Sequence, residues 1–373
     1  TRSRSWRAAL FCERVSRASR SRRSPRTRVS SRRPSRRSHT GRRVAGTCSD
    51  QEVPRVDRPR RPANVTPLRR APLRAGRRGR GRVRTDVQGK AVGSQPDQLP
   101  LIDYTRDTAS EEFFESLKSF GFATLIAHPL DMARVERIYQ EWQTYFSSGS
   151  ASDFSMDGEK QDGYVALDQA ESAKGQAVRD HKEYFQYYSW GRCPSHLKAD
   201  LDAHYQDCLE FSSTLLTWVA MHLPKDITEA LSMPLESMIA QSAQTMLRVL
   251  HYPPIVAGIE LPRAAAHEDI NLLTVLPASD GPGLELQRVD GGWLEVINRP
   301  SQVVVNIGDM LQEATGGFLR STTHRVATPS KGQAQKGRMS LPLFLHPRPE
   351  VVLSPRYTAN SYLSERLREL ALT

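Results

Sequence analysis

Apolar positions follow one period in the first part of this chain and a different one after about residue 244. Before that point they recur every three to four residues, which predicts amphipathic helices over about 109–119, 130–147 and 196–222. An apolar run at 122–126 predicts a strand between the first two helices. Residues 150–180 show neither period and are predicted to form a loop. We interpret the helices as a scaffold.

Beyond residue 244, short runs rich in Val, Ile, Leu and Thr alternate with Gly, Pro, Asp and Asn. Runs of this composition predict strands separated by turns, and several short strands at close spacing are typical of a jelly roll. A last helix is predicted over 361–371. The expected fold class is therefore α+β, a double-stranded β-helix (jelly-roll) core flanked by N-terminal and C-terminal helices. The predicted strands are 246–252, 270–276, 283–287, 293–297, 303–307 and 338–345.

The first 96 residues have neither period and a different composition. Residues 1–90 contain 28 Arg and one Lys against five acidic residues, a net charge of +24, so the rest carries −12 of the total of +12. So much like charge with so few apolar residues predicts disorder. Three interpretations stay open: a transit peptide, a nucleic-acid-binding arm, or translated sequence upstream of a misplaced start. We favour the third, because the chain begins with Thr1 and has no Met before Met132.

This pattern divides the chain into three parts. They are an Arg-rich segment (1–96), a scaffold of helices and strands (97–230) and a jelly-roll core with the last helix (231–373). The four cysteines are scattered, which argues against a disulfide framework and favours a reducing, cytoplasmic location. Since no apolar run approaches the roughly 18 residues of a membrane helix, we expect no membrane association.

A metal site is indicated by two histidines and one aspartate. His267 and Asp269 are two residues apart at the start of a predicted strand, where alternate side chains project from the same face. His324 lies 55 residues beyond Asp269 in another strand-like run. Two imidazoles and one carboxylate leave open positions on iron(II) for a co-substrate and O₂. Such a triad also arises by chance in a chain with ten histidines, so it needs a second indication.

That second indication is an R-x-S pair on an apolar strand. Arg338 and Ser340 lie two residues apart and should face the same side. A buried Arg needs an anion, and its planar group suits a carboxylate. A structural ion pair is the alternative explanation for Arg338.

Longer motifs surround these residues. They are HEDINLLTVL (267–276), GLEL (283–286), NIGDMLQ (306–312) and STTHRV (321–326), with GY (163–164) and DHKEYF (180–185) upstream. Together with R-x-S, they resemble the iron(II)- and 2-oxoglutarate-dependent oxygenases of the isopenicillin N synthase-like superfamily. The resemblance covers about residues 98–373 and none of the Arg-rich segment.

The resemblance implies roles for these residues. His267, Asp269 and His324 would bind Fe(II), with no catalytic residue expected beyond these ligands. Arg338 and Ser340 would hold the distal carboxylate of the co-substrate 2-oxoglutarate. The LHYPP segment is similar to the N-Y-Y-P-P of plant members and places Tyr252 at the co-substrate, although Leu250 stands where those members have Asn.

The expected activity is oxidation of a small-molecule substrate with O₂, releasing succinate and CO₂. Two alternatives within the family stay open: an oxidase of the isopenicillin N synthase type without 2-oxoglutarate, and an ethylene- and succinate-forming enzyme. The Arg-rich segment lacks the interleaved aromatic residues that stack on bases, so nucleic acid is not favoured as a partner. We expect a monomer. Gln244, Arg248 and Phe344 are candidates for substrate recognition.

Overall fold

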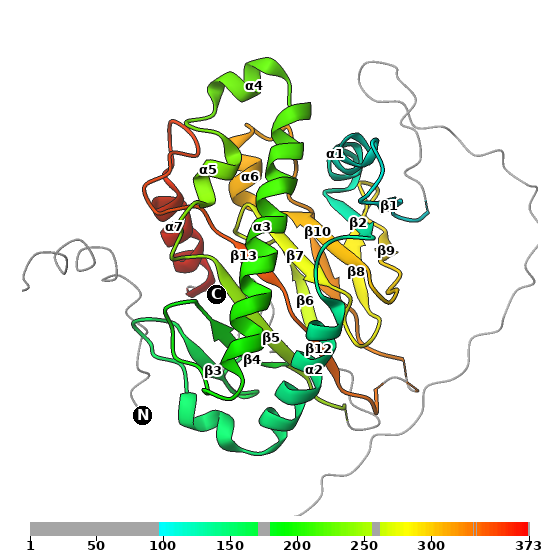
Figure 1. Ribbon diagram of the computed structural model, residues 1–373, viewed down its shortest axis with the longest axis vertical. Helices are drawn as coiled ribbons and strands as arrows, with labels where there is room; N and C mark the ends of the chain where they lie inside the picture. The colour runs from blue at the N-terminus through cyan, green and yellow to red at the C-terminus, as the bar shows by residue number, and fades with distance from the viewer. Residues whose placement is uncertain (1–96, 171–179, 256–261, 331, 333, 372–373) are drawn as a thin grey trace, which may run out of the picture. The chain divides into compact units, whose positions relative to one another are not determined.

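The computed structural model describes residues 97–170, 180–255, 262–330, 332 and 334–371. Figure 1 shows a core of strands with the long helix α3 crossing one face of it. The helices are α1 (Ala109–Phe120), α2 (Met132–Ser147), the 3₁₀ helix η2 (Ser150–Phe154), α3 (Lys198–His222), α4 (Lys225–Ala230), α5 (Leu235–Ile239), α6 (Asp309–Ala314) and α7 (Ala359–Ala371). The strands are β1 (Leu101–Asp103), β2 (Phe122–Ile126), β3 (Gly163–Val165), β4 (Glu183–Tyr187), β5 (Met246–Tyr252), β6 (Ala264–His267), β7 (Leu273–Pro277), β8 (Leu284–Gln287), β9 (Trp293–Glu295), β10 (Val303–Ile307), β11 (His324–Val326), β12 (Arg338–Ser340) and β13 (Leu343–Leu345).

The described strands form two sheets. The larger has the order β1-β2-β10-β7-β13-β5-β4-β3, with β12 also paired to β5, and the smaller has the order β6-β11-β8-β9. Neighbours are far apart in sequence, as in the pairs β2–β10 and β7–β13. This arrangement is the predicted α+β jelly roll. Strands β1 to β4 come from the part predicted as a scaffold, so scaffold and core share the larger sheet.

The two faces of the larger sheet differ in what they pack against. On β5, Leu247 and Val249 are fully buried in one apolar cluster with residues of the helices. Leu250 and Tyr252 instead pack with Val326 of the smaller sheet. Because successive side chains of a strand point to opposite faces, the larger sheet has a helix-facing side and an interior side that looks toward the smaller sheet.

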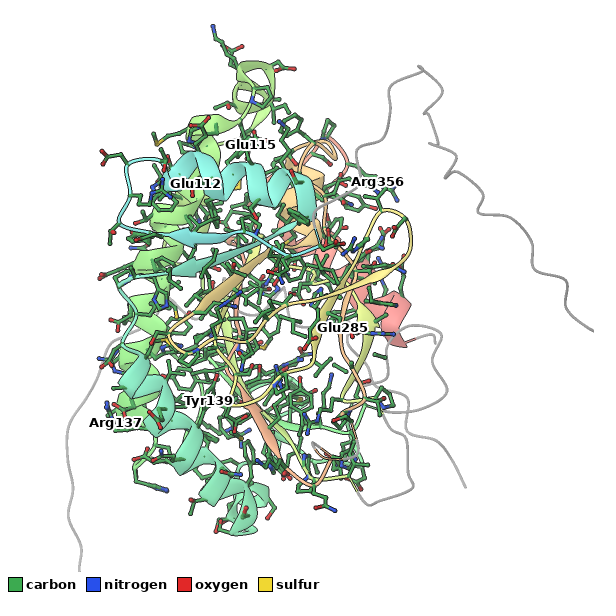
Figure 2. All side chains as sticks on the ribbon, turned by 90° about the vertical axis from the view of Figure 1, so that its right-hand side faces the viewer. Glu112, Glu115, Arg137, Tyr139, Glu285 and Arg356 are labelled. Atoms are coloured by element: carbon green, nitrogen blue, oxygen red, sulfur yellow. The ribbon has the colours of Figure 1, made fainter. Side chains whose placement is uncertain are left out.

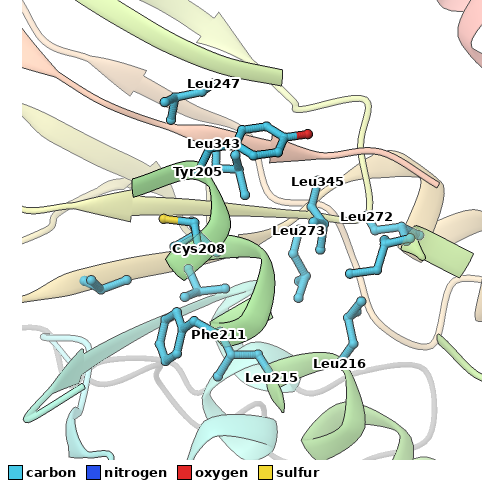
Figure 3. Close-up of a cluster of buried hydrophobic side chains, with 14 of the residues drawn as sticks. Tyr205, Cys208, Phe211, Leu215, Leu216, Leu247, Leu272, Leu273, Leu343 and Leu345 are labelled. Carbon is cyan, nitrogen blue, oxygen red and sulfur yellow. The ribbon is translucent and has the colours of Figure 1, made fainter. Parts of the chain in front are cut away.

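Helix α3 covers the helix-facing side. Its buried residues recur at helical spacing, so one stripe of its surface can face the strands. Figure 3 shows that stripe next to leucines of β5, β7 and β13. The labelled side chains are Tyr205, Cys208, Phe211, Leu215, Leu216, Leu247, Leu272, Leu273, Leu343 and Leu345.

Helix α2 links α3 to a turn of the barrel. Asp131 precedes the helix and caps it, because its side chain accepts a hydrogen bond from the backbone N–H of Arg134 at 3.0 Å. Arg137 pairs with Asp200 of α3 at 3.1 Å. Tyr139 points inward and donates its hydroxyl to the carbonyl of Ala278 at 3.2 Å. Figure 2 shows Arg137 at the outer edge of the helix and Tyr139 toward the strands.

Gly121 ends α1 and lies against the segment that precedes β11. Its φ of +70° is a left-handed conformation that favours glycine at a helix end. A Cβ placed there would lie 2.2 Å from the hydroxyl oxygen of Thr322 and 2.8 Å from the carbonyl oxygen of Arg320. The absence of a side chain at Gly121 therefore allows this segment to approach α1 just before His324.

Most predicted elements are confirmed. Strands β2, β5 and β10 have the predicted bounds, and α1, α2, α3 and α7 each differ from prediction by one or two residues at one end only. The predicted strand 338–345 is two strands, because the chain breaks at Pro342, whose carbonyl accepts a hydrogen bond from the N–H of Arg248 at 3.0 Å. The predicted loop 150–180 contains η2 and β3, and its residues 171–179 lie outside the described ranges.

The prediction of disorder for residues 1–96 concerns a segment outside the described residues. Within the described part of the chain, none of the helices combines the length and the apolar composition that crossing a bilayer requires.

Candidate functional site

The three predicted metal ligands meet between β6 and β11 of the smaller sheet. His267 is the last residue of β6 and is paired in register with His324, the first residue of β11. One possible ligand atom from each of His267, Asp269 and His324 lies within 4.8 Å of the others. The Nε2 atoms of both histidines are 3.8 Å from carboxylate oxygens of Asp269. Such spacing suits a single ion held by three ligands.

The prediction that one strand carries both His267 and Asp269 is wrong. Strand β6 ends at His267, β7 begins at Leu273, and Asp269 lies in the connection between them. The backbone carbonyl of Asp269 accepts a hydrogen bond from the N–H of Asp309 at 2.7 Å, which holds the connection against α6. A turn in the chain therefore brings Asp269 beside His267. Glu268 points away as expected and accepts a hydrogen bond from the hydroxyl of Thr323 at 2.8 Å.

Hydrogen bonds orient each member of the triad. The Nδ1 of His267 is 2.8 Å from the carbonyl of Ala265, and that of His324 is 3.1 Å from the carbonyl of Thr322. Since a carbonyl only accepts, each Nδ1 donates and each Nε2 keeps its lone pair for a metal. One carboxylate oxygen of Asp269 accepts hydrogen bonds from two side chains, Thr274 at 2.6 Å and Asn306 at 2.9 Å.

The electrostatics favour the protonation states that a metal requires. Partial desolvation, reinforced by the neighbouring His324, lowers the pKa of His267, whose side chain is 39% exposed. Burial acts to raise the pKa of Asp269, but the two histidines and the hydrogen bonds from Asn306 and Thr274 outweigh it, so this pKa lies below its ordinary value. At neutral pH His267 is therefore a neutral imidazole and Asp269 is ionised, so neither must lose a proton to bind a cation.

Arg338 lies on the interior side of β12, where its cross-strand partner on β5 is Tyr252. It is 2% exposed, and its Cζ atom lies 5.2 Å from the centre of the Tyr252 ring. Its Nε donates to the carbonyl of Gly281 at 3.1 Å and its Nη2 to the hydroxyl of Ser279 at 2.8 Å. Its Nη1 is buried and has no hydrogen-bond partner among the described residues.

Ser340 lies beside Arg338 and is 3% exposed. The hydroxyl of Ser279 donates to that of Ser340 at 3.4 Å, so one hydroxyl links the two residues of the R-x-S pair. A guanidinium nitrogen with an unused donor beside two hydroxyl groups matches the donor pattern that a carboxylate accepts. The described residues therefore fit the distal carboxylate of a 2-oxo acid.

The sequence did not single out Ser279, Thr274 or Asn306 for these roles. Asn306 lies in the NIGDMLQ motif, which marks the segment but not the contact with Asp269. Thr274 faces the interior side of β7. Because Leu273 before it is apolar, the alternation along this strand could have indicated that Thr274 points toward the site. Ser279 lies in an irregular turn that Tyr139 of α2 and Asn298 contact through hydrogen bonds, and the local sequence there has no periodic signal.

The predicted recognition residues are only partly brought together. The Cζ of Arg248 lies 5.5 Å from the centre of the Phe344 ring and 4.3 Å from that of Tyr184. The side-chain carbonyl of Gln186 accepts a hydrogen bond from the Nε of Arg248 at 3.1 Å. Gln244 is not part of this group, and its Oε1 is buried without a hydrogen-bond partner among the described residues.

Comparison with known proteins gives the same family from sequence and from structure. The model of the 2OG-Fe(II) oxygenase superfamily matches residues 243–347, which include the triad and the R-x-S pair. The fold is similar to the crystal structure of a Shewanella oneidensis protein described as an oxygenase. The identity is 47%, the match covers 74% of this chain and 100% of that chain, and the TM-score is 0.68. The chain belongs to the 2OG-Fe(II) oxygenase superfamily.

Two further relatives agree with this membership. A protein of the same oxygenase family from Caulobacter crescentus is 27% identical, with a TM-score of 0.61 over 73% of this chain and 99% of that chain. The oxoglutarate-dependent flavonoid 7-O-demethylase 1 of Ocimum basilicum is 27% identical over 285 residues, which is 72% of this chain and 73% of the relative.

The protein is therefore an enzyme that uses Fe(II), 2-oxoglutarate and O₂. When bound, iron and 2-oxoglutarate supply the oxidising chemistry, with succinate and CO₂ as products, and the protein binds, orients and shields the reactants.

Proposed function

We propose that His267, Asp269 and His324 hold the iron and that Arg338, Ser340 and Tyr252 hold 2-oxoglutarate for the oxidation of a small-molecule substrate. One observation carries the co-substrate part of this proposal. The buried Nη1 of Arg338 has no partner among the described residues, and such a group is costly unless an anion accepts its hydrogen bond. The distal carboxylate of 2-oxoglutarate is an anion of the required kind.

Support for the position of the prime substrate comes from the register of the larger sheet. Thr274 donates to Asp269 and is paired in register with Phe344, whose ring lies under the guanidinium of Arg248. Since neighbouring strands are about 4.8 Å apart, this aromatic and polar group lies within about two strand spacings of the triad. We propose that the interior sides of β4, β5 and β13 contact the substrate here.

The sequence alone also allows two other candidates. The second is an oxidase without 2-oxoglutarate, in which Arg338 and Ser340 would bind the substrate's own carboxylate, and the third is an enzyme that breaks down 2-oxoglutarate to ethylene and succinate. The name of the Ocimum relative, an oxoglutarate-dependent demethylase, favours the first reading over both. The succinate formed per O₂ consumed, with ethylene in the headspace, separates all three.

The test is an anaerobic titration of 2-oxoglutarate into the iron-loaded protein, monitored by the metal-to-ligand absorption band. We expect a saturable band, followed in air by succinate release that a panel of small organic molecules stimulates. A protein that forms the band but releases ethylene would support the third candidate. Absence of both the band and succinate would overturn the co-substrate proposal and leave the triad untouched.

We further propose that residues 97–373 carry this activity alone, as a cytoplasmic monomer. The residues proposed to hold iron and 2-oxoglutarate lie between 252 and 340, the strands proposed to contact the substrate lie between 183 and 345, and the Shewanella structure is covered completely by 74% of this chain. Cys193 and Cys208 are free thiols, as is usual in a reducing compartment. A 97–373 fragment should elute as a monomer and retain succinate formation; an aggregated or inactive fragment would refute this division of the chain.

A further inference from the structure

A second arginine, Arg263, is buried close to the proposed co-substrate residues. It is 3% exposed, and its Nη2 donates to the backbone carbonyl of Lys336 at 2.8 Å. Its Nε is buried and has no hydrogen-bond partner in the described part of the chain. A buried guanidinium that keeps an unused donor is unfavourable unless a ligand completes it.

The contacts of Arg263 place it next to the β5–β12 pair. Ala264, the next residue, packs in one apolar cluster with Tyr252. Lys336 precedes Arg338 by two residues, a separation of at most about 7 Å along the chain. A Cβ placed on the intervening Gly337 would lie 3.5 Å from the carbonyl oxygen of Tyr252. Arg263 therefore reaches the chain at the point where Tyr252 and Arg338 face each other.

The charges in this region do not balance within the described residues. Burial lowers the pKa of Arg263, and the positive charge of Arg338 lowers it further, against opposite effects of Tyr252 and Asp280. Asp280 is the carboxyl group that faces both arginines, and burial raises its pKa although Arg338, His251 and Arg263 act to lower it. Two buried cations thus share one nearby carboxyl group, which leaves room for a further anion.

We propose that Arg263 is a second cation of the co-substrate pocket and that, with Arg338, it selects a 2-oxo acid that ends in a carboxylate. This inference rests on the proposed function, because it concerns the anion assigned there to Arg338. Each arginine contributes one unused donor, and a carboxylate with two oxygens accepts from both. The alternative is that Arg263 only holds the Lys336 carbonyl, which would affect folding but not discrimination between 2-oxo acids.

The experiment compares two ligands that differ at the distal end. 2-Oxoglutarate and 2-oxopentanoate share the metal-binding end, but 2-oxopentanoate has a methyl group in place of the distal carboxylate. Both are titrated anaerobically into the full-length, iron-loaded protein by calorimetry. In Arg263→Gln we expect the Kd of 2-oxoglutarate to rise about 10- to 100-fold, the range for a lost hydrogen bond to a charged group, while that of 2-oxopentanoate stays unchanged.

Two further variants keep the test decisive. Arg263→Lys retains the stem and the charge, so it should fold, and it should reduce the preference for 2-oxoglutarate by about three- to tenfold because the planar group is lost. Arg348→Gln is the matched control, since Arg348 donates to the backbone carbonyls of Ser237 and Ala240 near α5. It should leave both Kd values unchanged.

The failures of the inference and of the proposed function are distinguishable. If the parent binds 2-oxoglutarate and folded Arg263 variants keep the same ratio of the two Kd values, Arg263 has only the structural role and the inference is overturned. A parent that does not bind 2-oxoglutarate would overturn the proposed function itself, and the inference with it.

Discussion

The helix-facing side and the interior side of the larger sheet are built from the same strands but carry different kinds of residues. On β13, Leu343 and Leu345 face the helices and are fully buried, whereas Phe344 between them lies under Arg248. On β12, Met339 joins the helix-facing cluster, whereas its neighbours Arg338 and Ser340 are the proposed co-substrate residues.

Neighbouring residues of one strand therefore have different roles: those on the helix-facing side stabilise the fold, and those on the interior side are available to bind ligands. Apolar packing on the helix-facing side needs no partner outside the protein, so it can hold the strands in register. The interior side can then keep polar groups whose hydrogen bonds are incomplete, such as the Nη1 of Arg338. Substitutions on the interior side should therefore affect turnover and ligand binding. Substitutions on the helix-facing side should affect the free energy of unfolding.

The largest expected effect on the interior is loss of the triad. His267→Ala, Asp269→Ala and His324→Ala should each abolish succinate formation and bound iron while the protein stays folded, because two remaining ligands do not hold the ion in place. Iron content and circular dichroism check this. His251→Ala is the control. Because His251 stacks on Phe146 of α2, the variant protein should keep its iron. Full activity in any triad variant would remove that residue from the site.

Arg338→Met should weaken 2-oxoglutarate binding by about 2 to 5 kcal/mol, or about 30-fold to several thousandfold in Kd, because a buried carboxylate loses its charged partner. The free energy of unfolding should change less than the binding free energy: Met keeps the apolar stem and removes the unsatisfied donor, which offsets the lost hydrogen bonds to Gly281 and Ser279. Anaerobic titration and thermal unfolding measure the two quantities. A large drop in the melting temperature with unchanged binding would instead assign Arg338 a structural role.

Leu343→Ala tests the opposite side of the sheet, one residue from Phe344. It should lower the free energy of unfolding by about 2 to 5 kcal/mol, the usual cost of truncating a fully buried leucine. The Kd of 2-oxoglutarate should stay within about twofold in the protein that remains folded. Urea unfolding and calorimetry check this pair of values, and a Kd shifted as far as in Arg338→Met would refute the division between the two sides.

A smaller effect is expected from pH, through His204 on the buried side of α3. Burial lowers the pKa of His204 from 6.5 to about 4, so between these values the unfolded chain binds a proton that the folded protein excludes. The free energy of unfolding should fall as the pH drops through this window, by roughly 1 to 3 kcal/mol from this group. In His204→Leu the dependence should flatten. An identical slope in parent and variant would exclude His204 as its source.

Local periodicity was enough to predict much of the fold and part of the site. Strands β5 and β10 have the predicted bounds because each is a short run rich in apolar residues that is bounded by turn-forming residues. The same alternation correctly placed Arg338 and Ser340 on one face, with Met339 on the other. The histidines of the candidate triad were predicted from their chemistry and spacing, and the structure brings them together with Asp269.

Contacts between distant segments decided the rest. Asp269 was expected on a strand but lies beyond its end, because its backbone is held by Asp309, forty residues later. Ser279 reaches Arg338 from a turn that is held by contacts with distant segments, among them Tyr139 of α2 and Asn298. The helices, the strands and the types of the metal-ligating residues can be predicted from residues that are close in the sequence. The register of the strands and the packing of helices against turns decide which unpaired donors lie close together. Neither produces a periodic pattern in the sequence.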